Sequence, residues 1–455
     1  MKQATTKKEK RHDRNYLIRV IAYALFAGCN GLETMAIGYL TYYMTNSLFL
    51  SVGAAGLIVA LAKVFDGFSD VIAGVIIDCS HSKLGKGRPF TLFGILTWGA
   101  LVLLFSTPQQ LPVGAKYAYV FIMYLLTDTV FRTLYATADP VHYRRGFNPA
   151  ERMDSASIWG LVGGLISIAG GIILPALVKI YEHQAHGWTV IMTILAIPSA
   201  VMFLLKFLLI PEKYDLEEPD AQQEKVKFGD AFRVLLRNKY LLLVGICLLL
   251  VTVIMSMSSA QTYYFTYIVG DLGQMSLANT FSMLSLVVMP FYPLIAKKVG
   301  KRRMTVWAFA IGTVISLVPI FCDKNVMVLG AVYAIRMCCY SALNMAPVWF
   351  TIDCMKYTEW KEGTRNDALC GAVISVAQKI GGALAMLITG LVLQVAGFNG
   401  SLAVQPQSAT GAIWFMYILF PAVIMAVCGL LMSRYKVEDL MPQIEQDLAA
   451  RANKQ

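Results

Sequence analysis

The stretch Lys63-Val-Phe-Asp66-Gly-Phe-Ser-Asp70 decides how this chain folds. Apolar sequence of helix length flanks it on both sides, so two carboxylates and an ammonium lie inside a predicted membrane span. A charge at the bilayer centre costs about 3 kcal/mol or more, so such residues face a protein interior or a watery cavity. Lys63, Asp66 and Asp70 share one helical face. The two neighbouring carboxylates predict a site for a proton or a small hard cation.

The composition predicts an all-α polytopic membrane protein. Of the 455 residues, 57% are hydrophobic and 15% are charged, whereas soluble domains carry about 25% charged residues. Apolar runs of roughly 20 residues recur along the chain and predict transmembrane helices. The first run is long enough to span the membrane, so no cleavable signal peptide is expected. The nine cysteines have no CxxC spacing and are expected to be small buried hydrophobes.

The basic residues predict the orientation of the spans. Most of the 39 Lys and Arg fall in the termini and in alternate loops, while the opposite loops hold little beyond Lys116, Lys179 and Lys324. By the positive-inside rule, both termini are expected on the cytoplasmic side of the cell membrane. The net charge of +11 is then a topology signal and requires no nucleic-acid partner. Twelve helices are predicted, at 18–45, 50–77, 90–107, 116–138, 156–180, 188–210, 239–268, 276–296, 304–322, 326–351, 368–396 and 411–433.

The chain is expected to divide into two six-helix bundles. The long polar stretch from Pro211 to Lys239 separates the halves. Basic turns that contain glycine recur at matching places, at 82–88 and 297–303, which favours a duplicated transporter, although any tight cytoplasmic turn collects Gly and Lys. The predicted parts are a cytoplasmic N-terminus (1–17), a first bundle (18–210), a cytoplasmic linker (211–238), a second bundle (239–433) and a cytoplasmic tail (434–455).

Five further charged residues are singled out within the predicted spans: Glu33, Asp128, Arg132, Arg336 and Lys379. Lys379 is about 16 Å into its helix, too deep for snorkelling, so it is expected to face a carboxylate or a cavity. Asp128 and Arg132 are four residues apart and are either a structural ion pair or part of the site. A structural role for Arg336 is as well supported as a functional one, and no role is assigned to Glu33.

Hydrogen-bonding groups beside aromatic rings suit a sugar, which has apolar faces and a hydroxyl edge. Most tyrosines near helix ends are expected to belong to the interfacial belt. Asn30, Tyr135 and Gln261 are the residues predicted from this pattern to line a binding pocket.

Three stretches together resemble the glycoside–pentoside–hexuronide:cation symporters, the major facilitator branch that includes the melibiose and glucuronide permeases. The resemblance extends from the first predicted helix to the last. It rests on residues 63–70 with the turn Ser82-Lys-Leu-Gly-Lys-Gly-Arg-Pro89, on Tyr263-Tyr-Phe-Thr-Tyr267, and on Asp353-Cys-Met-Lys-Tyr357-Thr-Glu359-Trp360-Lys361-Glu-Gly363 with Lys379-Ile-Gly381 downstream.

The resemblance implies a major facilitator fold, with two six-helix bundles around a central cavity and alternating access. It implies that Asp66 and Asp70 are the paired cation-site acids and that Lys379 lies beside them. Departures from the family pattern leave the substrate open. Asn30 stands where the melibiose permease has a sugar-binding aspartate. The other substitutions at sugar-site or sodium-site positions are Tyr135, Asp139, Trp159 (next to the position of an arginine) and Arg132.

Arg132 bears on the coupling ion and on the substrate. Near Asp66 and Asp70, its guanidinium would take the space and charge that sodium needs, which favours proton coupling or none. The arginine also suits a substrate with an anionic group, such as a hexuronide or a sulfonated sugar. The prediction is therefore a secondary active importer of a sugar or glycoside, coupled to H⁺ or Na⁺, with no other cofactor. A sodium-coupled symporter of neutral glycosides is the alternative.

Other classes of protein fit less well. The chain has no HExxH, GxSxG or P-loop signature, and its five histidines are expected in loops or tails, so an enzyme is not predicted. A lipid-type solute carrier of the same branch is the remaining rival, and its cleft would be apolar and open to the bilayer. The expected partners are a sugar or glycoside, a coupling cation and the lipid bilayer, and the protein is expected to be a monomer.

Overall fold

The computed structural model describes residues 15–80, 82–184, 186–214, 238–288, 291–322, 324–362 and 367–452. Most of the predicted N-terminus (1–17) and linker (211–238) lies outside these residues. The described part is helical, and each of the twelve predicted spans lies in a helical stretch. Seven helices in the described residues are long and apolar enough to cross a membrane, or eight when the bent pair 274–288 and 292–299 counts as one span. Charged spans such as 52–78 fall outside that count.

The elements of the first half surround α1. They are α1 (Tyr16–Gly38), α2 (Leu40–Asn46), α3 (Val52–Asp78), η1 (Arg88–Leu92), α4 (Phe93–Leu104), α5 (Val113–Tyr124), η2 (Leu125–Arg132), α6 (Thr133–Gly146), α7 (Pro149–Tyr181) and α8 (Gly187–Leu209). The fourth and fifth spans are longer than predicted, so Arg144, Arg145 and Arg152 lie in helical turns and not in a loop.

The second half repeats this pattern and adds a helix after its last span. Its elements are α10 (Lys239–Ser256), α11 (Ser258–Tyr264), η3 (Phe265–Val269), α12 (Gln274–Thr280), η4 (Phe281–Met283), α13 (Leu284–Val288), α14 (Tyr292–Val299), α15 (Lys301–Leu317), η6 (Val318–Ile320), α16 (Val326–Glu362), α17 (Asp367–Val395), α18 (Gln407–Trp414), η7 (Phe415–Leu419), α19 (Phe420–Ser433) and α20 (Val437–Ala452). The predicted tail therefore contains α20.

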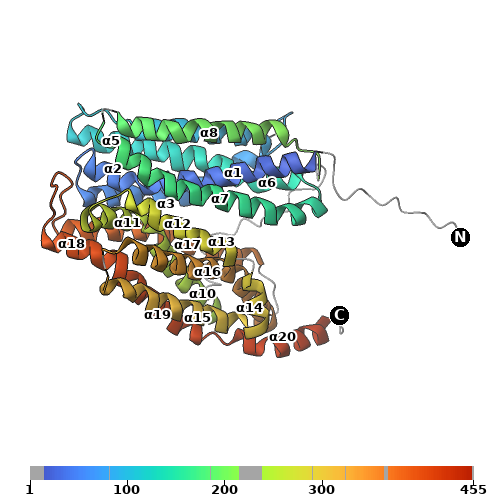
Figure 1. Ribbon diagram of the computed structural model, residues 1–455. Helices are drawn as coiled ribbons and strands as arrows, with labels where there is room; N and C mark the ends of the chain where they lie inside the picture. The colour runs from blue at the N-terminus through green and yellow to red at the C-terminus, as the bar shows by residue number, and fades with distance from the viewer. Residues whose placement is uncertain are drawn as a thin grey trace.

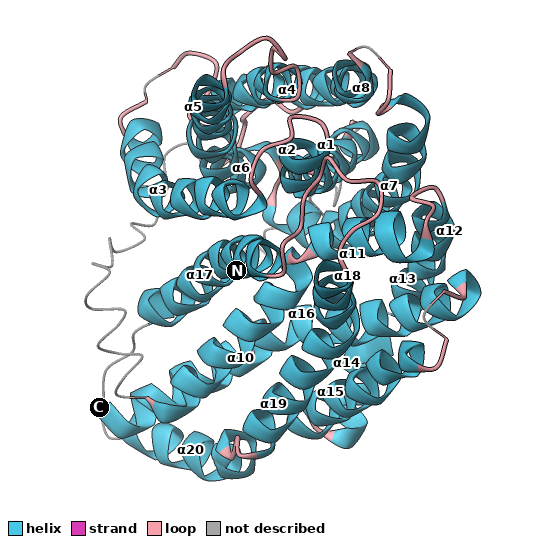
Figure 2. Ribbon diagram, turned by 90° about the vertical axis from the view of Figure 1, so that its left-hand side faces the viewer, coloured by secondary structure: helices cyan, strands magenta, loops and turns pink. Residues whose placement is uncertain are grey.

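The two halves form two layers of roughly parallel helices (Figure 1). Figure 2, which looks along the helices, shows α1 to α8 gathered on one side and α10 to α19 on the other. Large apolar side chains are exposed on the outer surface, for example Ile197 at 62%, Val314 at 64% and Leu430 at 69%. Such surfaces are typical of helices that face lipid. The start of α1 and the whole of α20 lie at the same end of the molecule (Figure 1).

The halves meet most closely along α3 and α17. Gly56 and Gly390 allow this approach, because a Cβ on Gly56 would lie 2.9 Å from the Cα of Gly390. Polar contacts join the halves at the end away from α20. Thr45 bonds Tyr263 at 2.8 Å, and Ser51 donates to Gln394 at 2.8 Å. The layers spread apart toward the α20 end (Figure 1).

Each of the two recurring basic turns is capped by a glutamate. Glu212, three residues after α8, accepts backbone N–H groups of Lys86, Gly87 and Arg88 at 2.7–2.9 Å. Glu438, in the first turn of α20, accepts those of Lys301 and Arg302 at 2.9 and 2.8 Å. A carboxylate after the last span of each half thus caps the turn after its second span. This shared arrangement supports the internal duplication.

We predict that Glu212→Gln destabilises the protein by about 1.5–3 kcal/mol, because charge-assisted hydrogen bonds contribute on that order. The carboxylate is 2% exposed, so water cannot replace the lost acceptor. Thermal unfolding of the purified protein in detergent measures the change. Glu445→Gln removes an exposed carboxylate that pairs with Lys356 and should leave the unfolding temperature almost unchanged. Equal effects of the two substitutions would contradict the structural role of Glu212.

Candidate functional site

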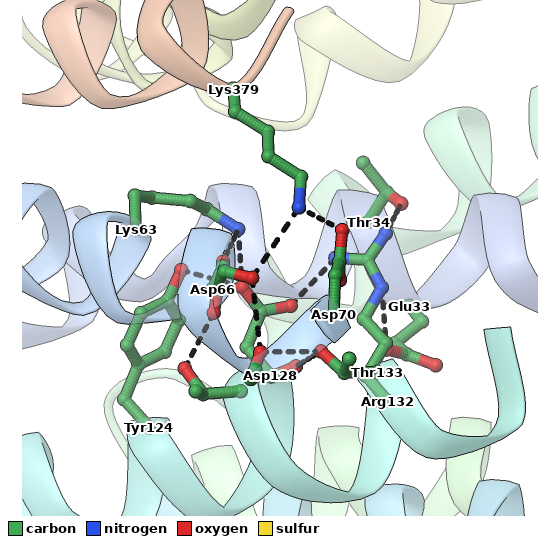
Figure 3. Close-up of polar contacts among 12 residues, drawn as sticks. Glu33, Thr34, Lys63, Asp66, Asp70, Tyr124, Asp128, Arg132, Thr133 and Lys379 are labelled. Atoms are coloured by element: carbon green, nitrogen blue, oxygen red, sulfur yellow. Dashed lines mark hydrogen bonds and ion pairs between the residues drawn. The ribbon is translucent and has the colours of Figure 1, made fainter. Parts of the chain in front are cut away.

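The motif 63–70 lies at mid-length of α3, where α3 faces η2 on one side and α17 on the other (Figure 3). Ser51 caps the start of α3, its hydroxyl accepting the N–H of Ala54 at 3.5 Å. Helical spacing then places Lys63, Asp66 and Asp70 on one side of the helix. The sequence prediction that these three residues share a face is confirmed.

Lys63 joins two carboxylates from different helices. Its ammonium donates to Asp66 at 3.1 Å and also to Asp128 of η2. Asp66 in addition accepts the hydroxyl of Thr129 at 2.5 Å. The side chain of Lys63 is 22% exposed, and that of Asp128 only 1%. The lysine therefore neutralises a carboxylate that has almost no access to solvent.

Asp128 is the most heavily paired acid of the site. It accepts hydrogen bonds from Lys63, from the Tyr124 hydroxyl at 3.1 Å and from Arg132 at 2.6 Å. Asp128 and Arg132 lie in η2, which has π-helical hydrogen bonding, a feature often found at functional sites. The predicted ion pair between Asp128 and Arg132 is confirmed, and Lys63 is a further member of it.

Arg132 extends the network to α1. Its Nη2 donates to Thr34 at 3.2 Å, and its Nε lies 3.3 Å from Glu33 Oε1. Glu33 Oε2 accepts the hydroxyl of Tyr135 at 2.7 Å, and the same hydroxyl lies 2.8 Å from Asn30 Oδ1. The guanidinium nitrogens of Arg132 are thus all in contact with groups of the protein. Two predicted pocket residues, Asn30 and Tyr135, lie close to the buried carboxylate of Glu33.

Lys379 of α17 closes the site from the second half. Its ammonium donates to the Asp70 carboxylate and lies 3.4 Å from the carbonyl oxygen of Asp66. The predicted proximity of Lys379 to the two aspartates is confirmed. Asp70 is 43% exposed and Lys379 is 32% exposed, which makes this pair the most accessible part of the site. It also links the two halves across their boundary (Figure 3).

The charges of the site do not cancel completely when every group is ionised. The cations are Lys63, Arg132 and Lys379, and each one contacts at least one acid. The acids are Glu33, Asp66, Asp70 and Asp128. One carboxylate is therefore in excess, and one bound proton or monovalent cation makes the cluster neutral. Low dielectric surroundings favour that neutral state.

Other predicted substrate residues lie apart from this cluster. Asp139 is bound by Lys206 of α8 and by the Tyr23 hydroxyl at 2.7 Å. Trp159 packs edge-on against Tyr23, with ring centroids 5.7 Å apart. Asp139 and Trp159 thus share a second cluster within the first half. A substrate-binding role for these two residues stays a prediction.

Gln261 belongs to the contact between the halves. Its amide donates to Asn279 at 2.9 Å, and Asn279 donates to the carbonyl oxygen of Gly171 in α7 at 2.7 Å. Arg336, whose role was left open, donates to the carbonyl oxygen of Tyr417 at 3.2 Å and to the Tyr340 hydroxyl at 3.3 Å. Both contacts of Arg336 lie within the second half, which supports its structural role.

Sequence reasoning missed Lys206, the buried partner of Asp139. The only signal was a lysine near the end of an apolar span, which is also the pattern of a snorkelling residue. The prediction that the histidines lie in loops or tails was wrong for His142. This residue lies in α6, is 1% exposed, and contacts Thr91 at 3.1 Å and the carbonyl oxygen of Ile210 at 2.8 Å.

The two helical halves and the comparisons with known proteins together define a polytopic transporter of the major facilitator fold and not an enzyme. The chain belongs to the MFS/sugar transport protein family, whose model matches residues 24–439. The predicted family resemblance and fold are therefore confirmed. The chain is 23% identical to the isoprimeverose transporter of Lactiplantibacillus pentosus over 92% of this chain and 88% of the relative. It is 24% identical to a putative sulfoquinovose importer of Escherichia coli, over 96% and 94% of the two chains.

A solved structure supports the fold independently. The crystal structure of a bacterial homologue of the human lysosomal transporter Spinster, inward-facing and unoccupied, aligns with a TM-score of 0.69. The sequences are 11% identical, and the alignment covers 95% of this chain and 99% of the other. At this identity the similarity concerns the fold alone.

We predict that Lys63→Met destabilises the protein by about 3–5 kcal/mol, because it leaves the buried Asp128 carboxylate with one cation fewer. The double variant Lys63→Met/Asp128→Asn should recover part of that loss, since it removes the uncompensated charge. Thermal unfolding in detergent measures both variants. The exposed Lys361→Met serves as a control and should unfold like the parent. A double variant that is less stable than Lys63→Met would contradict the pairing.

Proposed function

We propose that this protein imports a sugar or glycoside by alternating access and that one proton is taken up with each sugar. The observation that supports this best is the single excess carboxylate in a cluster that spans the boundary between the halves. One proton neutralises this excess negative charge and needs no further ligands. The family and the relatives support a sugar as the substrate.

Sodium fits the same cluster less well. A hard cation needs several oxygen ligands at once, and the oxygens of Asp66 and Asp128 already accept bonds from Lys63, Arg132, Thr129 and Tyr124. These contacts support the proton over sodium.

Lys379 and Asp70 are proposed to couple the protonation state of the charged cluster to the motion of the halves. Their ion pair joins α17 to α3. A change from one open side to the other must alter the contacts along this boundary, so the pair has to loosen or exchange partners. Asp66, Asp70 and Lys379 keep their predicted role in coupling. We further propose that the end of the molecule where α1 begins and α20 lies faces the cytoplasm (Figure 1).

Uptake of labelled glycosides into proteoliposomes tests the coupling ion. With an imposed pH gradient (acid outside) in sodium-free buffer, sugar should accumulate above the outside concentration. Collapse of the gradient with a protonophore should abolish that accumulation. Strict dependence on sodium at constant pH would contradict proton coupling, and the sodium-coupled glycoside symporter would then be the correct alternative.

A second candidate substrate is an acidic sugar. The similarity to a putative sulfoquinovose importer supports it, and Arg132 is the cation that would receive an anionic group. The guanidinium of Arg132 already contacts Glu33 and Asp128, so an anionic substrate would first have to displace one of these carboxylates. This favours neutral glycosides as substrates.

Competition distinguishes the two substrates. We expect neutral glycosides, isoprimeverose among them, to compete more strongly for uptake than glucuronides or sulfonated sugars. Each competitor is present at the same concentration in sodium-free buffer at fixed pH. Stronger competition by the acidic sugars would instead support an anionic substrate bound by Arg132.

A further inference from the structure

Glu33 is the acid with the weakest compensation in the charged cluster. It lies in the last third of α1, and its side chain is fully buried. Oε2 accepts the Tyr135 hydroxyl at 2.7 Å. Oε1 lies 3.3 Å from Arg132 Nε, but among the described residues it accepts no hydrogen bond. A buried carboxylate with an oxygen that lacks a donor is costly in its ionised form, and protonation of the carboxyl group lowers that cost.

The other three acids differ from Glu33 in this respect. Asp66 and Asp128 each accept hydrogen bonds from a cation and from a hydroxyl group, and Asp70 accepts one from Lys379. The only cation beside Glu33 in the described residues is Arg132, which is shared with Asp128. The excess proton of the cluster is therefore expected at Glu33.

The position of the Tyr135 hydroxyl also indicates Glu33 as the site of the proton. It lies within hydrogen-bond distance of both Glu33 Oε2 and Asn30 Oδ1, at 2.7 and 2.8 Å. A phenol has one hydrogen, so it can donate to only one of these two oxygens. When Glu33 is ionised, its charge attracts that hydrogen. When Glu33 is protonated, the glutamic acid can donate to the Tyr135 oxygen, and the Tyr135 hydrogen is free to bond Asn30.

We infer that Glu33 carries the coupled proton and that the Tyr135 hydroxyl transmits its protonation to Asn30. This inference rests on the proposed proton-coupled sugar import and names the residue that performs it. In the protonated state, Asn30 Oδ1 has a donor, so the Asn30 amide is held in one orientation next to the sugar. In the ionised state that donor turns away. Protonation and sugar binding then favour each other.

The groups that face Glu33 from its neighbours are consistent with this role. Arg132 and Asp128 of η2, Tyr135 of α6 and Lys63 of α3 are the charged or titratable groups that act on it, and Cys29 lies on α1 itself. Arg132 is 29% exposed while Glu33 is fully buried, and its Nε lies 3.3 Å from Glu33 Oε1. Arg132 is therefore the partly exposed cation that contacts the buried acid.

The test compares Glu33→Gln with the wild type in proteoliposomes. Gln has the shape of the protonated acid and an N–H that can donate to Tyr135. We expect Glu33→Gln to keep sugar exchange at equal concentrations on both sides, but to lose accumulation driven by a pH gradient. Sugar affinity of the wild type should fall as pH rises, by up to about tenfold per pH unit where Glu33 titrates. The affinity of Glu33→Gln should not change with pH.

Two further variants make the result specific. Glu182→Gln is the matched control, because Glu182 also accepts a tyrosine hydroxyl, from Tyr42 at 3.1 Å, but lies outside the charged cluster. It should keep pH-driven accumulation. Tyr135→Phe should retain proton uptake but weaken the dependence of sugar affinity on pH, because it removes the hydroxyl that connects Glu33 to Asn30.

The outcomes separate this inference from the proposed function. If the wild type accumulates sugar with protons and Glu33→Gln does so equally well, another acid carries the proton and the inference is wrong. Loss of both exchange and binding in a folded Glu33→Gln variant would also overturn it, because the acid would then be needed in its ionised form. A wild type that transports without protons contradicts the proposed function itself.

Discussion

The structure depends on the compensation of charge in a place that water hardly reaches. Asp128 has almost no solvent exposure, and donors from α3, α5 and η2 surround it. Each of these donors lies in a predicted membrane span. Helices that would otherwise pack through interchangeable apolar side chains are thereby held in one register, because a shift by one turn would leave buried charges without partners.

In the proposed mechanism, the same cluster couples the proton to the motion of the halves. A cluster that lacks one positive charge would be neutralised by one cation, and binding would change the contacts within the cluster. Lys379 and Asp70 extend the cluster across the boundary between the halves, where α3 and α17 touch at Gly56 and Gly390. Small residues of this kind let two helix backbones approach closely. Charge state and relative position of the halves are thus connected through a small number of side chains.

The sequence allowed prediction of the membrane spans and of the shared face of residues 63–70, because hydropathy and helical spacing are local properties that can be read along the chain. The position of Lys379 beside these residues was implied by the family resemblance. The sequence did not allow prediction of Lys63 as a bridge between Asp66 and Asp128, of Lys206 as the partner of Asp139, or of the proximity of Glu33 to Tyr135. Each of these contacts joins helices that lie far apart in the chain, and their mutual rotation is not encoded in any local pattern.

The chain by itself determined that apolar runs long enough to span a membrane recur along it, that its basic residues gather between alternate runs, and that a few charges must be buried. Only the tertiary structure decided which charge neutralises which. The sequence of one helix does not say which neighbouring helix its charged side chains will meet. The ion pairs therefore follow from the way the twelve predicted spans pack together. That packing leaves Glu33 with less compensation than the other three acids, because Arg132 can fully satisfy only one of the two carboxylates between which it lies.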